Sequence, residues 1–381
     1  MPPAYPYDRL DGAKAKAARH PGGVVDLSIG TPCDPPPPEV VAALGGSGTE
    51  RGYPASIGSP AYRGAATDWL IHRLGAEVDQ VAACVGTKEF VATTPQWMKL
   101  RRPDRDTVLY PAISYPTYEM GAILAGCRPV PVPTDDQWRL RLDAIEPADA
   151  DRALLLWVNS PGNPAGQLDD LSAAAAWGRE RGVPVFSDEC YAEFTWDGPP
   201  RSILQAGSEG VVAVHSLSKR SNLAGVRAGF YAGDGELVTY LSEVRKHVGM
   251  MVPGPVQAAA VVALGDQNHV EVQRELYRAR LERFAKILEA VGVGVELPAG
   301  GFYLWARADG SVARAPGTNA AGGPDATDPA AAWALTDRLA ADGGVLVSPG
   351  EFYGRAGAGH IRVAMVAPME SLELVASRLG V

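Results

Sequence analysis

The chain has 381 residues, of which 46% are apolar and 21% charged, and its formal net charge is −9. This composition is ordinary for a globular protein, and the length favours one large and one smaller domain over a single small core. The negative charge argues against a general nucleic-acid or anionic-membrane surface.

The sequence also restricts the compartment. The first residues lack the basic-then-apolar pattern of a secretory signal, and no apolar run is long enough to span a bilayer. The cysteines stand singly, at Cys33, Cys84, Cys127 and Cys190. Such spacing favours reduced, buried thiols over a disulfide framework or a zinc site. We therefore predict a cytoplasmic protein with no metal site.

The first third of the chain alternates short apolar runs with helical patterns. The expected elements are a helix at 8–20, strands at 24–30, 81–85 and 107–110, and helices from about 39, at 61–74 and from 86. The last of these helices should be kinked or interrupted at Pro95, because proline cannot donate within a helix. Tyr115 and Tyr118 follow in a loop-to-helix region.

From residue 153 the alternation becomes regular. Strands are expected at 153–158, 183–187, 211–214 and 226–232, with helices at 168–181, 236–247 and, as one long helix, 255–289. Repeated strand–helix units predict an α/β fold with a mostly parallel sheet and helices on both faces. No internal repeat is present.

The remaining residues predict a smaller domain. Strands at 302–305, 345–349 and 360–365 combine with helices at 329–341 and from 369. Residues 308–329, rich in Gly, Ala, Pro, Asp and Thr, predict a mobile surface loop. We divide the chain into an amino-terminal arm with part of the small domain (1–44), a large domain (45–275) and a small carboxyl-terminal domain (276–381).

Polar residues gather where the predicted strands end. Gly86, Asn163, Asp188, Ser216 and Lys219 each follow a strand. In open α/β sheets, ligands bind beyond the carboxyl ends of the strands. This shared position carries more weight than any single motif.

Lys219 follows the apolar strand that ends at Val214 and is preceded by two serines. A lysine held against apolar walls loses its proton readily and becomes a nucleophilic amine that forms Schiff bases with carbonyl compounds. A basic, serine-containing loop in solvent is the alternative interpretation of this motif. The other strand-end residues favour the first.

Pyridoxal phosphate accounts for the whole set. Its aldehyde needs an amine, as in Lys219, and its pyridine nitrogen needs an acidic partner, as in Asp188. Asn163 and Tyr191 are placed to contact its phenolate oxygen. Its phosphate needs amide N–H groups, hydroxyls and an arginine, which are available at Gly86, Thr87, Lys88, Ser216, Ser218 and Arg227.

The motifs resemble those of the class I aminotransferases, which are fold-type I pyridoxal-phosphate enzymes. The stretches that carry the resemblance are Asn163-Pro164-Ala165-Gly166, Asp188-x-x-Tyr191, Ser216-x-Ser218-Lys219 and Gly225-x-Arg227-x-Gly229. They occur in family order, and the resemblance runs from Gly30 to Arg362. It implies a large domain with a mostly parallel seven-stranded sheet flanked by helices and a smaller α+β domain.

The resemblance also implies individual roles. Lys219 would carry the cofactor and shuttle the proton between substrate Cα and cofactor C4′. Tyr115 would stack on the cofactor ring, with Tyr118 behind it. Tyr53 would reach the phosphate of the partner subunit in a homodimer. Arg362 would bind the substrate α-carboxylate, covered by Gly30 and with Asn163 nearby.

Within the family, the chain is most similar to succinyldiaminopimelate aminotransferases of the actinobacterial type. The stretches 25–32, 187–191 and 244–253 carry this similarity. The implied reaction transfers an amino group between glutamate/2-oxoglutarate and N-succinyl-2-amino-6-oxopimelate in lysine and diaminopimelate biosynthesis. The second carboxylate of that substrate would need another cation, for which the candidates are Lys88, Arg220, Arg245 and Lys246.

Other functions stay open at this point. An aspartate or aromatic aminotransferase, or a β-lyase of the same fold, would use the same cofactor residues. A non-catalytic sensor that binds the cofactor and regulates transcription is less well supported, because no DNA-binding module precedes Gly30. A nucleotide-binding protein lacks support, since no G-x-G-x-x-G or P-loop follows the first strand.

Overall fold

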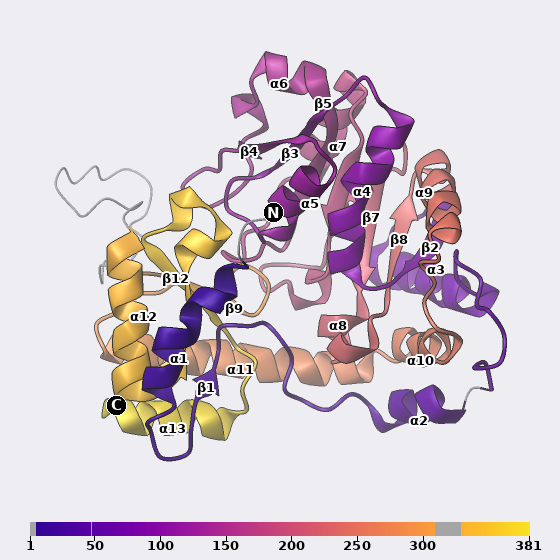
Figure 1. The fold of residues 1–381 in the computed structure, drawn as a ribbon. Coiled ribbons are helices and arrows are strands. Elements are labelled where there is room, and N and C mark those ends of the chain that lie inside the picture. The colour runs from indigo at the N-terminus through magenta and orange to yellow at the C-terminus, as the bar shows by residue number, and fades with distance from the viewer. Residues whose placement is uncertain (1–4, 47, 309–328) are drawn as a thin grey trace.

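A computed structural model describes residues 5–46, 48–308 and 329–381. Its central element is a seven-stranded sheet with strand order β2-β8-β7-β6-β5-β3-β4 (Figure 1). The strands are β2 (Gln80–Cys84), β3 (Thr107–Pro111), β4 (Arg128–Val132), β5 (Ala153–Asn159), β6 (Val185–Asp188), β7 (Val211–Ser216) and β8 (Gly229–Gly233). Neighbouring strands are parallel, except that β8 runs antiparallel to β2 and β7. The mostly parallel sheet is therefore confirmed.

Helices cover both faces of this sheet. One face packs on α2 (Pro38–Gly46), α3 (Pro60–Leu74), α7 (Leu171–Arg181) and α10 (Gly254–Gly265). The other packs on α4 (Thr87–Arg101), α5 (Thr117–Leu124) and α9 (Gly235–His247). Side chains of a strand alternate between the faces, so Val211 and Ala213 of β7 join the first cluster while Val212 and Val214 join the second.

A second layer of elements lies beside the sheet. It contains the antiparallel sheet β11-β12-β9, formed by Ser348–Pro349, His360–Ala364 and Tyr303–Arg307, with α11 (Asn268–Ala290), α12 (Pro329–Gly343) and α13 (Met369–Leu379). The two ends of the chain meet here, because β1 (Val25–Asp26) pairs in parallel with β10 (Val345–Leu346). Helix α1 (Asp11–Ala17) lies against α12 (Figure 1).

The predicted helix over residues 255–289 is wrong as a single element. It is two helices, α10 and α11, separated at Asp266 and Gln267. Asp266 has an extended backbone, and its carboxylate accepts a hydrogen bond from Asn268 N at 2.9 Å, which favours a new helix start over continuation. The apolar periodicity on either side conceals this break.

Other differences involve proline. Helix α4 continues through Pro95 without interruption. Strand β4, with sequence Arg-Pro-Val-Pro-Val, was not predicted; it is an edge strand, where missing N–H donors are tolerated. The short helix α6 (Pro147–Arg152) was also not predicted.

Further expectations concern the surface loop, the cysteines, membrane-spanning segments and the domain division. Residues 309–328, most of the predicted surface loop, lie outside the described residues. The four cysteines are free, as expected, but only Cys84 and Cys127 are buried, whereas Cys33 is exposed and Cys190 is half-buried. Within the described ranges, no helix is both long and apolar enough to cross a membrane. The three-part domain division stays a prediction, and its second boundary falls within α11.

Candidate functional site

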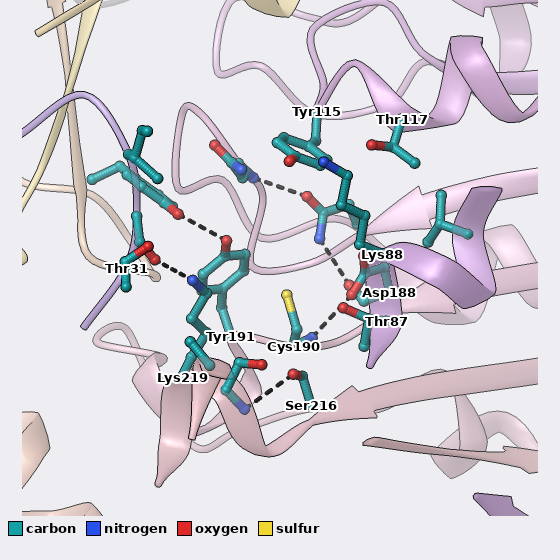
Figure 2. Close-up of a pocket in the computed structure, with 18 of the residues that line it drawn as sticks. Thr31, Thr87, Lys88, Tyr115, Thr117, Asp188, Cys190, Tyr191, Ser216 and Lys219 are labelled. Atoms are coloured by element: carbon teal, nitrogen blue, oxygen red, sulfur yellow. Dashed lines mark hydrogen bonds between the residues drawn. The ribbon is translucent and has the colours of Figure 1, made fainter. Parts of the chain in front are cut away.

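One pocket of about 380 Å³ collects most of the predicted site residues (Figure 2). It lies at the carboxyl ends of β5, β6 and β7, where Asn159, Asp188 and Ser216 line it. The predicted residues on its wall are Gly30, Thr87, Lys88, Tyr115, Asn163, Asp188, Tyr191, Ser216, Ser218, Lys219, Arg227 and Arg362. Residues far apart in the sequence thus meet where the fold predicts a ligand.

Lys219 extends into the pocket from the four-residue helix α8 (Leu217–Arg220), directly after β7. Its Nζ donates a hydrogen bond to the carbonyl of Gly30 and lies 5.7 Å from the centre of the Phe302 ring. Burial lowers the pKa of Lys219 to about 8, and the positive charges of Arg362 and Arg227 act in the same direction. A much larger fraction of this amine than of an ordinary lysine is therefore neutral and nucleophilic near neutral pH.

Asp188 supplies a buried acid on the opposite part of the pocket. Its Oδ2 accepts a hydrogen bond from the Tyr118 hydroxyl at 2.9 Å, and its Oδ1 accepts one from Cys190 N at 3.2 Å. Burial raises the pKa of Asp188, an effect that these hydrogen bonds oppose. A carboxylate so placed is stabilised by a cationic group bound in the pocket.

An anion-binding corner lies at the amino-terminal end of α4. Gly86 precedes the helix with φ +79°, and a Cβ atom on it would lie 2.1 Å from Arg227 Nη2. The helix start presents free N–H groups and a positive dipole end beside this guanidinium. Ser216 and Ser218 complete the corner, with Ser216 Oγ accepting from Ser218 N at 3.1 Å.

Arg362 forms the other charged end of the pocket. It is 1% exposed and lies between the rings of Tyr303 and Tyr353, at 4.3 and 4.7 Å from their centroids. Its Nη1 donates to Asn163 Oδ1 at 2.8 Å and its Nη2 to the carbonyl of Ser28. The planar guanidinium is held in one orientation, as recognition of a carboxylate requires.

Close packing explains the glycine at position 30. A Cβ atom there would lie 2.2 Å from the Tyr303 hydroxyl. That hydroxyl lies 2.9 Å from the hydroxyl of Tyr191, which also lines the pocket. The Gly30 segment therefore contacts the small sheet through Tyr303 and Lys219 through its carbonyl.

Tyr53 is not part of this pocket. Its side chain is fully exposed, and it does not contact Lys219 or Arg227 within the chain. Tyr115 does line the pocket, beside Lys88, whose Nζ lies 5.7 Å from the ring centroid.

Of the four candidate cations for a second carboxylate, Lys88 lines the pocket and the other three do not. Arg245 is fully buried and makes two hydrogen bonds, of 2.8 and 2.6 Å, to Glu89. Arg220 is buried and donates to the carbonyl of Ala263. Lys246 pairs on the surface with Glu243. Of these four candidates, Lys88 is therefore the one whose position suits contact with a ligand in the pocket.

A family model for aminotransferase class I and II matches residues 22–379. The chain belongs to this aminotransferase family. The 4-dedimethylamino-4-oxo-anhydrotetracycline transaminase OxyQ of Streptomyces rimosus is 41% identical, with 99% of each chain aligned. An LL-diaminopimelate aminotransferase of Aquifex aeolicus is 31% identical over 99% of this chain and 96% of its own length. A solved structure, a probable N-succinyldiaminopimelate aminotransferase from Thermus thermophilus, is 29% identical, covers 98% of both chains and has a TM-score of 0.82.

This aminotransferase is therefore an enzyme dependent on pyridoxal 5'-phosphate, and its pocket suits that cofactor. The amine, the buried acid and the anion-binding corner match the aldehyde, the pyridine nitrogen and the phosphate in chemical type. Arg227 leaves no room for a side chain at position 86. A residue larger than glycine would therefore obstruct the helix start, where a phosphate would bind.

Sequence reasoning missed several wall residues of the aminotransferase pocket. Tyr118 was predicted only to lie behind Tyr115, whereas its hydroxyl contacts Asp188. Tyr303 was assigned only to a strand, and Tyr5 and Tyr7 only to the region before the first helix. The three-residue spacing of Tyr115 and Tyr118 across the start of α5 was an available signal for the first. Nothing local indicated the others, because they reach the pocket from distant parts of the chain.

Proposed function

We propose that the pocket catalyses transamination between an amino acid and a 2-oxo acid. The observation that carries the proposal is the convergence of Lys219, Asp188 and Arg362 on one cavity. An amine, a buried acid and a carboxylate-binding guanidinium are the groups that this reaction requires. The family membership supports the same reaction class.

Several side chains would hold the cofactor. Asp188 would contact the pyridine nitrogen, and Asn163 and Tyr191 the phenolate oxygen. Gly86, Thr87 and Lys88 would contact the phosphate through their backbone N–H groups, Ser216, Ser218 and Arg227 would contact it through their side chains, and Tyr115 would cover the ring. Bound pyridoxal phosphate supplies an electron sink for the pair left at substrate Cα when its proton is removed.

Lys219 would move that proton. Its pKa of about 8 is close to the pH at which a general base and acid works best near neutrality. This favours both removal of the proton from substrate Cα and its return. Its hydrogen bond to the Gly30 carbonyl holds the buried amine at the pocket wall.

Arg362 would bind the substrate α-carboxylate with two parallel hydrogen bonds. Asn163 already accepts from Arg362 Nη1 and therefore sets the direction of the fork. This contact fixes the α-carbon of the substrate relative to Lys219, and orientation of this kind contributes a large part of catalysis.

For the substrate, we propose N-succinyl-LL-2,6-diaminopimelate with 2-oxoglutarate as amino acceptor. Support comes from the sequence similarity described above and from the 29% identity to the Thermus enzyme. Lys88 lies at the pocket wall, 4.9 Å from the Tyr5 ring centroid and exposed to solvent, and would meet the distal carboxylate. Unsuccinylated LL-diaminopimelate, named in the Aquifex relative, carries a distal carboxylate too.

A second candidate is amino transfer to a ketone on an aromatic ring system. The wall that contains Tyr5, Tyr7 and Tyr115 favours a flat apolar group, and OxyQ, at 41% identity, is named for such a substrate. Transamination of aspartate or aromatic amino acids, and β-lyase chemistry, would need only the residues around the cofactor and Arg362.

We further propose that the enzyme acts as a cytoplasmic homodimer with shared sites. The family resemblance described above supports this proposal, and the fully exposed ring of Tyr53 is accessible to another chain. In a dimer, Tyr53 would contact the phosphate corner of the other subunit.

The core of the proposal is tested by spectroscopy. The purified protein should be yellow, with an absorption band near the visible edge, and Lys219→Ala should abolish turnover while the fold is retained. A colourless protein that fails to take up added pyridoxal phosphate refutes the proposal.

The substrate proposal is tested with a panel of amino donors and keto acceptors. It includes succinyldiaminopimelate, LL-diaminopimelate, aspartate, aromatic amino acids and an aromatic ring ketone, with keto-acid release measured for β-lyase activity. The highest kcat/KM should be found for the succinylated substrate. A preference for any other member assigns the enzyme to that reaction instead.

The role of Lys88 is tested with Lys88→Ala and a matched control, Lys246→Ala. Loss of one charge-assisted contact should lower kcat/KM for the succinylated substrate about tenfold and leave a short substrate nearly unchanged. Lys246 lies outside the pocket, so its variant should change neither value. Equal losses on both substrates contradict the role of Lys88 in binding the distal carboxylate.

A further inference from the structure

A small second cavity lies behind the wall of the active-site pocket. Its volume is about 10 Å³, close to the minimum that one water molecule needs. Cys190 and Ser216, both labelled in Figure 2, line the pocket and this cavity alike. The remaining wall includes Glu189, His215 and Arg220. The cavity is therefore polar and shares a wall with the cofactor site.

Three buried polar atoms on this wall have no hydrogen-bond partner among the described residues. They are Glu189 Oε2, His215 Nε2 and Arg220 Nε. Their residues are 1%, 3% and 4% exposed. The Glu189 and His215 atoms are 3.3 Å apart. Buried polar groups are almost always paired, with protein or with ordered water, so three unpaired atoms on one small cavity indicate an occupant.

Other polar atoms of Glu189 and Arg220 make hydrogen bonds, and these bonds fix the orientation of the two side chains. Glu189 Oε1 accepts from Ile203 N at 2.7 Å. Arg220 Nη1 donates to the carbonyl of Ala263 at 2.7 Å. Glu193 lies 3.6 Å from Arg220 Nε and is itself held by Trp69 Nε1 at 3.0 Å. Glu189 and Arg220 therefore cannot turn to relieve their unpaired atoms without breaking one of these contacts.

The cavity connects the two strand ends that carry cofactor residues. Asp188 and Glu189 follow each other at the end of β6, and His215 and Ser216 at the end of β7. Because side chains alternate along a strand, Asp188 and Ser216 face the pocket while Glu189 and His215 face the α3 side. A bridge between Glu189 and His215 therefore links the positions of Asp188 and Ser216.

We propose that one water molecule occupies this cavity, bridging Glu189 Oε2, His215 Nε2 and Arg220 Nε, and that this bridge positions Asp188 and Ser216 for the cofactor. Water supplies two donors and two acceptors, so it accepts from Arg220 Nε, donates to His215 Nε2 and pairs with Glu189 in either protonation state. Burial lowers the pKa of His215 to about 3, so its ring is uncharged at neutral pH, and raises that of Glu189 to about 7, so its carboxyl group is about half protonated there. Glu189, His215 and Arg220 are positioning residues here, since they do not touch the cofactor.

The water is tested by a crystal structure of the cofactor-bound enzyme at a resolution that places ordered solvent. One ordered water within hydrogen-bonding distance of all three atoms is expected. A dry cavity, or direct hydrogen bonds among the three side chains, overturns this part of the proposal. This result does not depend on the proposed function of the pocket.

The positioning role rests on the proposed role of Asp188 and is tested with two variants. His215→Phe keeps an aromatic ring beside Trp69, which lies 5.0 Å away, but removes the acceptor of the water. It should weaken pyridoxal-phosphate binding about tenfold and shift the pH midpoint of the bound cofactor's absorption band. Glu189→Gln can still pair with the water and should change both values much less.

A matched control separates positioning of the cofactor residues from the general effect of altering a buried polar side chain. Thr336→Val alters a fully buried hydroxyl of α12 that has no hydrogen-bond partner in the described part of the chain and lies outside both cavities. Cofactor affinity and the absorption midpoint should be unchanged in this variant. If His215→Phe changes them no more than Thr336→Val does, the positioning role is overturned, whereas a colourless wild-type protein would overturn the proposed function instead.

Discussion

Lys219 combines burial with a donor contact that leaves its amine directed at the pocket. Its Nζ reaches the Gly30 carbonyl, while Arg362 and Arg227 lie near enough to disfavour its charged form. Burial also disfavours the charged form of Asp188, which is negative. A cationic ring nitrogen bound beside Asp188 and a covalent bond at Lys219 would relieve both. A ligand that carries both an aldehyde and a ring nitrogen could therefore satisfy both residues at once.

The reactivity of the free amine should follow its lowered pKa. In cofactor-free protein, the rate of pyridoxal-phosphate uptake should rise with pH and level off above an inflection near 8, because only the neutral amine attacks the aldehyde. Stopped-flow absorbance over a pH series measures this profile. An inflection near the ordinary lysine value of 10.5 contradicts the buried environment of Lys219.

Glu189 should make stability depend on pH. Its pKa is about 7 in the folded chain and about 4.5 when exposed, so between these values the folded chain holds a proton that the unfolded chain has lost. The free energy of unfolding therefore falls as pH rises through this range. Urea unfolding at pH 4.5 and 7.5 should show a smaller fall for Glu189→Gln than for the wild type. Equal falls in both proteins contradict the raised pKa.

At the scale of elements, the sheet and the residues at its strand ends were predictable because both depend on local pattern. Apolar runs gave β5, β6 and β7, and the parallel arrangement placed Asp188 and Lys219 at one edge. The break between α10 and α11 was not predicted, because a single side chain, Asp266, interrupts the helical pattern of apolar residues. The tyrosines at positions 5, 7 and 303 escaped because only the tertiary fold brings them to the pocket.

The start of α4 should tolerate no side chain at position 86. Gly86→Ala places a Cβ on Arg227 and forces a positive φ on alanine, so pyridoxal-phosphate affinity should fall by about tenfold or more. Equilibrium dialysis or fluorescence titration measures the affinity. The control is Gly64→Ala in α3, where a Cβ meets no atom within 4 Å. Unchanged affinity in Gly86→Ala contradicts the proposed phosphate corner.

Helix α11 anchors the segment that carries Gly30. Arg280 makes two hydrogen bonds of 2.6 Å to Asp34, and Gln273 adds one of 2.8 Å. The Arg280 side chain is 4% exposed, so Asp34→Ala leaves a buried charge unpaired and should cost about 3–5 kcal/mol of stability. KM should also rise, because Gly30 lies four residues away in the pocket wall.

The control for this prediction lies on the same helix. Arg283 pairs with Glu373 in solvent, at 30% and 52% side-chain exposure, so Glu373→Ala should have a much smaller effect. Urea unfolding compares the two variants, and steady-state kinetics measures KM. Similar losses of stability in both variants would show that burial does not distinguish these pairs.

At the scale of the whole molecule, one feature of the site is incomplete within a single chain. The phosphate corner has helix α4, two serines and Arg227, but the tyrosine that the family resemblance assigns to it, Tyr53, is fully exposed. The active unit that we propose is a dimer in which each chain completes the site of the other. In this arrangement each active site needs residues from two chains, and experiments that mix two variants can test this.

Mixing two defective chains should restore activity if Tyr53 acts across the dimer. Lys219→Ala abolishes its own site, and Tyr53→Ala weakens phosphate binding in the partner's site. In a mixed dimer, one site carries both defects, whereas the other combines an intact Lys219 with an intact Tyr53 and should be fully active. When the two variants are unfolded together, refolded and assayed at limiting pyridoxal phosphate, the activity of the mixture should therefore exceed the sum of the activities of the separate variants.

If Tyr53 acts only within its own chain, every site in the mixture keeps one defect and no activity is regained. Light scattering on the same samples shows whether dimers formed, so an absence of rescue among dimers rules out the shared site, and a monomer rules out the dimer itself.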